Sequence, residues 1–281
     1  YLILHSIMDF LKTENWNFAS ANPIIVAGPC SAESEEQVLS VAKSLSAIKV
    51  FDNKPRAVDI FRAGIWKPRT RPNSFEGVGD AGLKWLSKVK SIYNFPIAVE
   101  AATPRHIELC LKNKIDVLWI GARTTVNPFL VQEIAEALEG VDIPVMIKNP
   151  INPDIELWIG AIERIYNIGI KKIIAVHRGF SSFEKSIYRN KPNWEIPIEM
   201  KRRFPNLPLI CDPSHICGNT ENIPSVCQKA IDMSFDGLMI EVHPNPIEAL
   251  SDKAQQIALE DFEILLNKLI LRKPTTDDIL V

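Results

Sequence analysis

Eight short apolar runs divide this chain at regular intervals. They begin near residues 24, 57, 96, 117, 144, 173, 207 and 237. Each interval has room for a strand, a helix and two loops, as in a βα unit. Eight such units predict a (β/α)₈ barrel, a closed ring of parallel strands surrounded by helices. An open, doubly wound α/β sheet is the alternative, but the near-uniform spacing and the lack of a glycine-rich nucleotide loop favour the barrel.

Helix-start signals lie between these runs. Ser34 is followed at the third position by Gln37, which is the spacing of a capping box. Elsewhere a side chain that can cap a helix directly precedes a proline, a residue that suits the first helical turn. These pairs are Thr103-Pro104, Asn127-Pro128 and Asn152-Pro153. Gly169 is typical of a helix end, and apolar spacing near the C-terminus predicts a last helix over about 253–271.

Size and composition limit the possible classes of function. The 281 residues predict a single domain, with an N-terminal extension over 1–22 and a polar C-terminal tail over 273–281. The net charge of −2 and the lack of a basic tract argue against nucleic acid as a partner. No apolar run reaches the roughly 18 residues of a membrane span, and no signal peptide is expected. The five cysteines are odd in number and form no CxxC pair, which favours a cytoplasmic protein without disulfides.

Six basic residues come at the ends of the predicted strands or in the loops just after them. Arginine forks match the oxygens of phosphate and carboxylate groups, and lysine adds a point charge. Active sites of (β/α)₈ barrels lie at the C-terminal ends of the strands. The six therefore predict one site for a small, highly anionic, phosphorylated ligand, with separate surface ion pairs as the alternative. They are Arg62, Lys67, Arg69, Arg123, Lys148 and Arg178.

A second group could bind a divalent metal ion. Cys30, His215, Glu241 and Asp252 bring sulfur, nitrogen and oxygen donors to the same predicted edge of the barrel. Their spacing fits no zinc-finger pattern. The alternative is a small buried thiol at Cys30 and an ordinary hydrogen-bond network around His215 and Glu241.

Other candidates give weaker signals. His106 falls in the first turns of a predicted helix and is expected at the surface. His243 either faces the same edge as Glu241 or has a structural role. Trp66, beside Lys67, could line a pocket. Cys211, Cys217 and Cys227 are expected to pack as buried thiols.

Five short motifs, taken in order, resemble one enzyme family. They are Gly28-Pro29-Cys30-Ser31, Lys67-Pro68-Arg69-Thr70, Gly121-Ala122-Arg123-Thr124, Ile147-Lys148-Asn149-Pro150 and Asp212-Pro213-Ser214-His215. Over about residues 20–271 the chain resembles 3-deoxy-D-arabino-heptulosonate 7-phosphate (DAHP) synthase of the short bacterial class. The resemblance implies a (β/α)₈ barrel that condenses phosphoenolpyruvate with erythrose 4-phosphate, the first step of the shikimate pathway.

The resemblance also implies roles for individual residues. It implies one divalent metal ion (manganese, iron, cobalt or zinc) held by Cys30, His215, Glu241 and Asp252. Substrate contacts are implied for Arg62, Lys67, Ala122, Arg123, Lys148 and Arg178, and for Arg69 and Thr70 on the erythrose 4-phosphate side. The expected catalytic residues are Lys67, Glu100, Cys30 and His215. The expected assembly is a homodimer or homotetramer.

Related proteins leave two alternatives open. The sister family, 3-deoxy-octulosonate 8-phosphate synthase, uses arabinose 5-phosphate and has Asn and Ser where this chain has Lys-Pro-Arg-Thr at 67–70. A non-catalytic barrel that only binds its ligands is the other. The chain departs from the commoner pattern at 71–77 and at His177-Arg178-Gly179-Phe180, where Glu-Arg-Gly is usual. Both forms resemble a subgroup in which a chorismate mutase domain follows the synthase, and we expect no mutase segment within these 281 residues.

Overall fold

A closed parallel sheet forms the centre of the molecule. The computed structural model describes residues 8–12, 16, 23–51, 54–67 and 73–271. The strands are β1 (Ile24–Gly28), β2 (Ile60–Arg62), β3 (Ile97–Glu100), β4 (Val117–Ile120), β5 (Val145–Lys148), β6 (Ile173–His177), β7 (Leu209–Cys211) and β8 (Gly237–His243). They pair in chain order, and β1 also pairs with β8, which closes the ring. A two-residue strand, β9 (Ile257–Ala258), pairs in parallel with the end of β8. The predicted (β/α)₈ barrel is confirmed.

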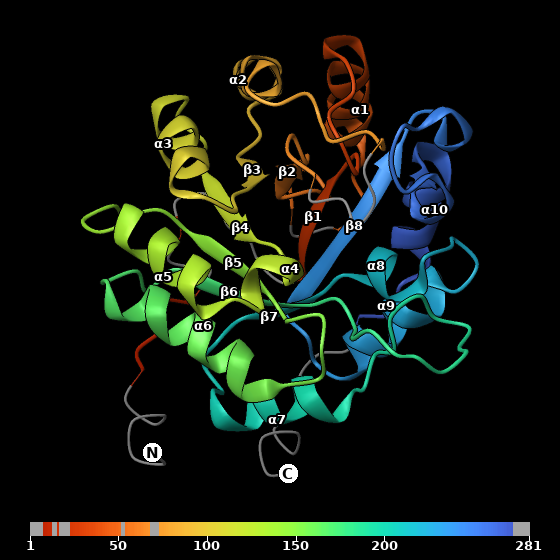
Figure 1. Ribbon diagram of the computed structural model, residues 1–281. Coiled ribbons are helices and arrows are strands. Elements are labelled where there is room, and N and C mark those ends of the chain that lie inside the picture. Colours follow the sequence, from red (N-terminus) through yellow and green to blue (C-terminus); the bar gives the residue numbers. More distant parts are fainter. Residues whose placement is uncertain (1–7, 13–15, 17–22, 52–53, 68–72, 272–281) are drawn as a thin grey trace.

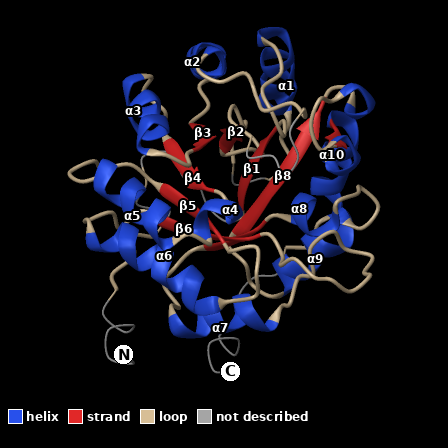
Figure 2. Cartoon of the chain, viewed as in Figure 1, coloured by secondary structure: helices blue, strands red, loops and turns tan. Residues whose placement is uncertain are grey.

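Helices surround this ring (Figures 1 and 2). They are α1 (Glu35–Ala47), α2 (Ala81–Tyr93), α3 (Pro104–Lys112), α4 (Ala122–Thr125), α5 (Pro128–Ala137), α6 (Ile155–Asn167), α7 (Glu195–Arg203), α8 (Pro213–Cys217), α9 (Ile223–Asp232) and α10 (Leu259–Lys268). Two short 3₁₀ helices, η2 (Pro246–Glu248) and η3 (Lys253–Gln255), lie between β8 and β9.

Most of the predicted helix boundaries are confirmed. The side chains of Ser34, Thr103 and Asn127 accept hydrogen bonds from the first turns of α1, α3 and α5. Helix α6 ends just before Gly169, whose φ is +99°.

Two predictions were wrong. The cap of α6 is Asp154 rather than Asn152, because the chain makes a further turn before the helix begins. The last helix begins at Leu259 rather than near residue 253, because η3 and β9 occupy the first part of that segment.

The pleat of the strands decides which side chains enter the barrel. Side chains alternate between the two faces of a strand. Val26, Trp119 and Met239 belong to a buried cluster made almost entirely of strand residues, whereas their strand neighbours pack with the helices. On each strand, the next inward-facing residue lies two positions after the last member of this cluster. These residues stand at the C-terminal mouth. Around the barrel these residues are Gly28, Arg62, Glu100, Gly121, Lys148, Arg178, Asp212 and Glu241. The alternation therefore gathers six ionisable side chains into one layer.

The two glycines of this layer are required by close packing. A Cβ at Gly28 would lie 2.0 Å from the carbonyl oxygen of Arg62, and its φ of +154° disfavours other residues. A Cβ at Gly121 would lie 2.1 Å from Oε1 of Glu100. The glycines thus leave space for their charged neighbours.

Aspartates secure the opposite end of the barrel. Asp59, Asp116 and Asp236 each precede a strand and accept a backbone N–H from the start of the neighbouring strand, at 2.8, 2.9 and 2.8 Å. Each of these carboxylates is also paired with a lysine; the pairs are Lys54–Asp59, Lys90–Asp116 and Lys201–Asp236. The same arrangement recurs at the strand pairs β1–β2, β3–β4 and β7–β8, at the end of the barrel opposite the C-terminal mouth.

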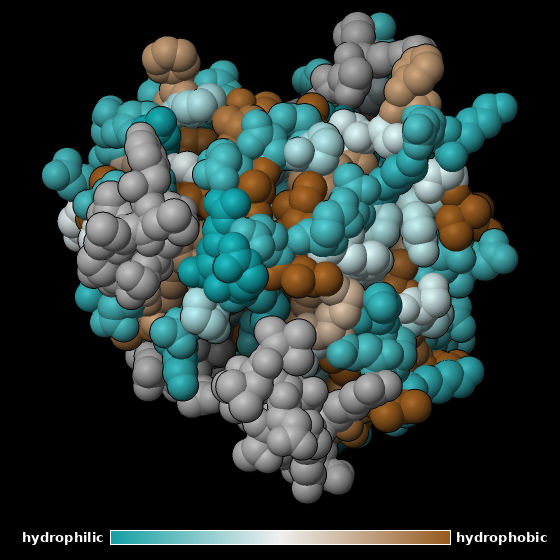
Figure 3. All heavy atoms as spheres, turned by 90° about the horizontal axis from the view of Figure 1, so that it is seen from below, coloured by the Kyte–Doolittle hydropathy of each residue, from teal (hydrophilic) through white to brown (hydrophobic). Residues whose placement is uncertain are grey.

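The outer surface is mixed in character. On the face shown in Figure 3, hydrophobic side chains are scattered among hydrophilic ones. Within the described ranges, no helix has both the length and the apolar character that a membrane span needs.

Candidate active site

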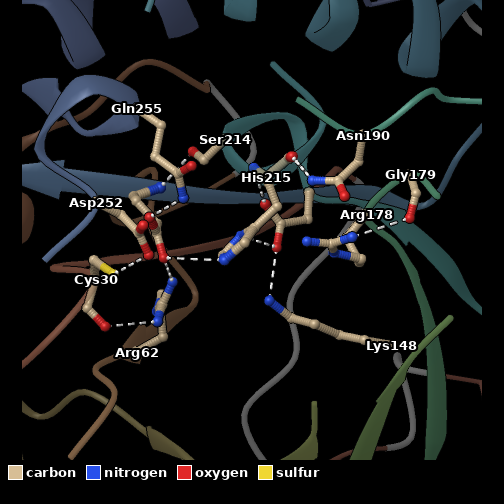
Figure 4. Close-up of polar contacts among 12 residues, drawn as sticks. Cys30, Arg62, Lys148, Arg178, Gly179, Asn190, Ser214, His215, Asp252 and Gln255 are labelled. Atoms are coloured by element: carbon tan, nitrogen blue, oxygen red, sulfur yellow. Dashed lines mark hydrogen bonds and ion pairs between the residues drawn. The ribbon is translucent and has the colours of Figure 1, made fainter. Parts of the chain in front are cut away.

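Cys30 lies beside the C-terminal end of β1, close to Asp252 and Arg62 (Figure 4), and it also contacts Lys67. Its Sγ is 3.4 Å from Oδ2 of Asp252 and 3.0 Å from Nζ of Lys67. The carbonyl oxygen of Cys30 accepts hydrogen bonds from Lys67 at 2.6 Å and from Arg62 at 3.1 Å. Asp252 reaches this position from the turn after β8, where its φ of 42° is in the left-handed region that aspartate tolerates better than most residues.

Glu241, on β8, is completely buried and is held through both carboxylate oxygens. Its Oε1 accepts a 2.6 Å hydrogen bond from Arg62, and its Oε2 accepts one of 2.8 Å from Gln255. Nε2 of His215 is 3.9 Å from the same Oε1. Burial by itself would raise the pKa of Glu241, but His215, Arg62 and Lys67 outweigh it and lower that pKa to about 2. The carboxylate is therefore ionised at neutral pH.

Asp212 links the basic residues to His215. Its Oδ2 accepts a 2.7 Å hydrogen bond from Lys148 and lies 2.8 Å from Nδ1 of His215. Burial opposes ionisation of Asp212, but His215 and Lys148 hold its pKa well below the usual value. With Nδ1 beside this carboxylate, Nε2 of His215 is turned toward Glu241. A carboxylate behind a histidine is the usual support for a metal-binding imidazole.

Arg178 follows β6 and is buried at the same mouth. Its backbone N–H donates to Oδ1 of Asn149 at 2.7 Å, which ties the end of β6 to the end of β5. Burial lowers the pKa of Arg178 to about 10, although Asp212 opposes this effect. The guanidinium is still charged at neutral pH, and it is therefore available to an anion.

The predicted residues around β3 and β4 lie at the same mouth. Ala122 and Arg123 begin α4, which covers the strand ends in Figure 1; Ala122 is buried and Arg123 is exposed. Arg123 is near enough to Arg178 to contribute to its lowered pKa. Glu100 is half-buried, with its carboxylate against Gly121.

The four predicted metal ligands lie together, and each contacts a charged neighbour. Cys30 contacts Lys67, Glu241 contacts Arg62, Asp252 contacts Arg189 at 3.1 Å, and His215 contacts Asp212. Across the described residues, no three His, Cys, Asp or Glu side chains are posed to hold a metal ion together.

The chemistry of this donor set nevertheless fits a divalent cation. A thiol, an imidazole and two carboxylates form two adjacent pairs, Cys30–Asp252 at 3.4 Å and His215–Glu241 at 3.9 Å. Burial and Glu241 raise the pKa of the Cys30 thiol to about 11, although Lys67 opposes them. At neutral pH the thiol is therefore protonated, and a divalent ion would have to displace that proton.

Three further side chains belong to the site. Asp212 belongs to the motif Asp212-Pro213-Ser214-His215. Its position just after a predicted strand could have identified it as a site residue. Arg189 reaches Asp252 from the loop after β6, a contact that no local pattern predicts. Gln255 is uncharged, so a search for ionisable residues passes over it.

The weaker candidates are resolved in part. His106 was predicted at the surface. It is half-buried there, with its ring stacked on Trp66 at 3.9 Å between centroids. His243 is buried, with Nε2 3.5 Å from Glu33. All five cysteines are free and buried, as predicted for Cys211, Cys217 and Cys227. The predicted substrate contacts Arg69 and Thr70 lie outside the described residues.

Fold and site together define a (β/α)₈ barrel whose C-terminal mouth gathers basic side chains around acid, thiol and imidazole groups. The sequence profile of the DAHP synthetase I family matches residues 17–273. This chain belongs to that family, as the five motifs indicated.

Known relatives agree with this assignment. The phospho-2-dehydro-3-deoxyheptonate aldolase of Thermotoga maritima is 32% identical over 245 residues, which cover 87% of this chain and 68% of the relative. The crystal structure of that protein superimposes with a TM-score of 0.80 at 30% identity, covering 92% of this chain and 72% of the other. A 2-dehydro-3-deoxyphosphooctonate aldolase of Desulfotalea psychrophila is 29% identical over 261 residues and covers 88% of both chains.

Proposed function

We propose that this chain condenses phosphoenolpyruvate with erythrose 4-phosphate to give DAHP and inorganic phosphate. The observation that carries the proposal is the inward-facing layer at the mouth, where Arg62, Lys148 and Arg178 project from three strands. Both substrates are phosphate esters, and phosphoenolpyruvate adds a carboxylate. Cations drawn from separate strands can grip such groups from several sides.

The chain's own residues hold and orient the reactants. Arg62, Lys148 and Arg178, together with Lys67 and Arg123, neutralise the phosphate and carboxylate of phosphoenolpyruvate. Holding C3 of phosphoenolpyruvate close to the aldehyde carbon supplies much of the rate gain. The new bond joins these two carbons, the aldehyde oxygen becomes a hydroxyl, water adds at C2, and the C2–O bond to phosphate breaks.

Cys30, His215, Glu241 and Asp252 would hold one divalent ion. When bound, an ion of manganese, iron, cobalt or zinc supplies Lewis-acid polarisation of the aldehyde oxygen. Lys67 contacts Cys30 and so lies beside these four proposed ligands. It would bring the anion of one substrate close to the aldehyde of the other. Glu100, whose carboxylate lies against Gly121, would orient the attacking water and accept its proton.

The cellular setting follows from the same family. We infer a cytoplasmic enzyme, supported by five cysteines that are all free thiols. We also infer a homodimer or homotetramer, for which the resemblance to the family is the support.

A phosphate-release assay tests the function. Purified protein is given phosphoenolpyruvate with erythrose 4-phosphate, with and without a chelator, and divalent ions are then restored one at a time. We expect phosphate release that stops on chelation and returns with at least one ion. Release that persists in full after chelation would contradict the metal role.

The similarity to a 2-dehydro-3-deoxyphosphooctonate aldolase makes a second sugar substrate the alternative. Its substrate, judged by the family's chemistry, is arabinose 5-phosphate. Running the same assay with that sugar separates the two functions: release with arabinose 5-phosphate alone would replace our proposal. Binding of phosphoenolpyruvate without release from either sugar would leave a non-catalytic barrel.

A further inference from the structure

We propose that Gln255 is a positioning residue for the metal centre, which fixes the carboxylate of Glu241 in the orientation that a cation needs. This inference rests on the proposed metal role of Glu241. Gln255 was not predicted from the sequence, since it carries no charge and does not end a strand.

The position of Gln255 is set by the turn that also presents Asp252. Gln255 is the last residue of η3, and its backbone N–H donates to the carbonyl oxygen of Asp252 at 3.1 Å. Its exposed fraction is 1%. A polar side chain this deeply buried needs partners for its amide, and it finds them inside the site.

The amide of Gln255 bridges two charged groups, Glu241 and Arg189. Its Nε2 donates to Oε2 of Glu241 at 2.8 Å, and its Oε1 accepts from Arg189 at 2.7 Å. The same guanidinium nitrogen of Arg189 contacts Oδ1 of Asp252 at 3.1 Å. Gln255 therefore contacts one predicted ligand directly and a second through Arg189.

The bond to Glu241 determines which oxygen is presented. With Oε2 held by Gln255, Oε1 is turned toward Arg62 and His215. Without it, the carboxylate could rotate about its last bond, because the terminal torsion of glutamate is broad. An amide suits the task because it donates on one side and accepts on the other while adding no charge.

The neighbouring Gln256 uses the same chemistry on the first ligand. Its Oε1 accepts the backbone N–H of Cys30 at 2.9 Å, and its Nε2 donates to the carbonyl oxygen of Ser251 at 2.8 Å. Consecutive amides after Asp252 thus support both Cys30 and Glu241. Groups that orient metal ligands in this way typically change metal affinity by about 10- to 100-fold when they are removed.

The test compares Gln255→Met with a matched control, Gln132→Met. Gln132 also bridges a glutamate and an arginine, with Nε2 3.0 Å from Glu136 and Oε1 3.1 Å from Arg164, but on α5 away from the site. We would measure Mn²⁺ binding by titration calorimetry, and the unfolding temperature of each variant with chelator and with saturating Mn²⁺.

We expect Gln255→Met to bind Mn²⁺ about 10- to 100-fold more weakly, with a smaller Mn²⁺-induced rise in unfolding temperature, while Gln132→Met matches the wild type. Turnover at saturating Mn²⁺ should recover more fully than turnover at low Mn²⁺. Gln255→Glu, which keeps the length of the side chain and the acceptor for Arg189, should show the same loss and decides the matter if Gln255→Met does not fold.

Two results would overturn the inference, and they are distinguishable. If the wild type binds Mn²⁺ and Gln255→Met or Gln255→Glu binds it equally well, Gln255 is structural only and the proposed function is untouched. If the wild type binds no divalent ion, the metal role itself fails and the inference fails with it.

Discussion

Replacing His177 with phenylalanine should change how stability depends on pH. His177 follows Val176 on β6 but points outward, where its ring packs on Phe180, Trp194 and Phe235. Neither ring nitrogen has a well-aligned hydrogen-bond partner in the described part of the chain. Burial and then Arg178 lower the pKa of His177 to about 3, although Asp212 and the backbone of Pro192 favour the charged form.

The magnitude follows from this pKa. In the unfolded chain the imidazole titrates near 6.5, so between pH 6.5 and 3 the unfolded state takes up a proton that the folded state excludes. Stability is therefore complete above pH 6.5 and falls below it, by about 1.4 kcal/mol per pH unit. From pH 6.5 to pH 5 the loss due to His177 is about 2 kcal/mol. Phenylalanine has a similar shape and no proton to exclude.

Urea unfolding at pH 7.5 and pH 5.0 measures this difference. We expect the free energy of unfolding of the wild type to fall by about 2 kcal/mol more than that of His177→Phe over this interval. Other titrating groups are common to both proteins and cancel. At pH 7.5 the variant should be as stable as the wild type or slightly more so, because a buried polar group without a well-aligned partner has been removed. Equal losses in the two proteins would refute the reasoning.

Further substitutions test the charged layer. Arg62→Met leaves the buried carboxylate of Glu241 unpaired, so we expect a loss of about 3–5 kcal/mol in the free energy of unfolding, measured by urea unfolding, together with loss of phosphate release. Gly121→Ala places a Cβ 2.1 Å from Oε1 of Glu100 and should displace that carboxylate; the protein should fold with reduced turnover, and unchanged turnover would remove Glu100 from the mechanism. Cys30→Ala should abolish metal-dependent turnover, whereas Cys110→Ala, which alters a buried thiol on α3, should retain it.

The sequence was sufficient for the barrel because its signals are local. Eight apolar runs at regular spacing, with capping residues such as Ser34 and Thr103 between them, leave few other arrangements. The two wrong predictions of where a helix begins also came from local signals. Asn152 and Asp154 are both good caps two residues apart, and apolar residues after 253 fit a helix although the chain first forms η3 and β9.

The residues that gather at the mouth could be predicted as a set, but the contacts between their side chains could not. Charged residues after apolar runs identified Arg62, Lys148 and Glu241, because parallel strands bring their C-terminal ends together. Which side chain contacts which depends on the closure of the sheet: Arg62 and Glu241 are 179 residues apart and meet only because β8 joins the ring beside β1. The inward face could not be read from the strands themselves, since buried parallel strands are apolar on both faces.

The pairings have a consequence for how the site binds its ligands. Arg62, Lys67 and Lys148 are the expected anion-binding groups, yet each contacts an acid or a thiol of the predicted metal centre or its support. Buried charges are tolerated only when they are paired, so these contacts offset the cost of burying the cations before a substrate arrives. An incoming phosphate or carboxylate must then compete with Glu241 or Asp212 for the same cations. A divalent cation held by the proposed ligands would relieve that competition, because it would bind the acids and leave the bases to the anion. Anion and cation binding at this mouth should therefore strengthen each other, and by the same factor in both directions.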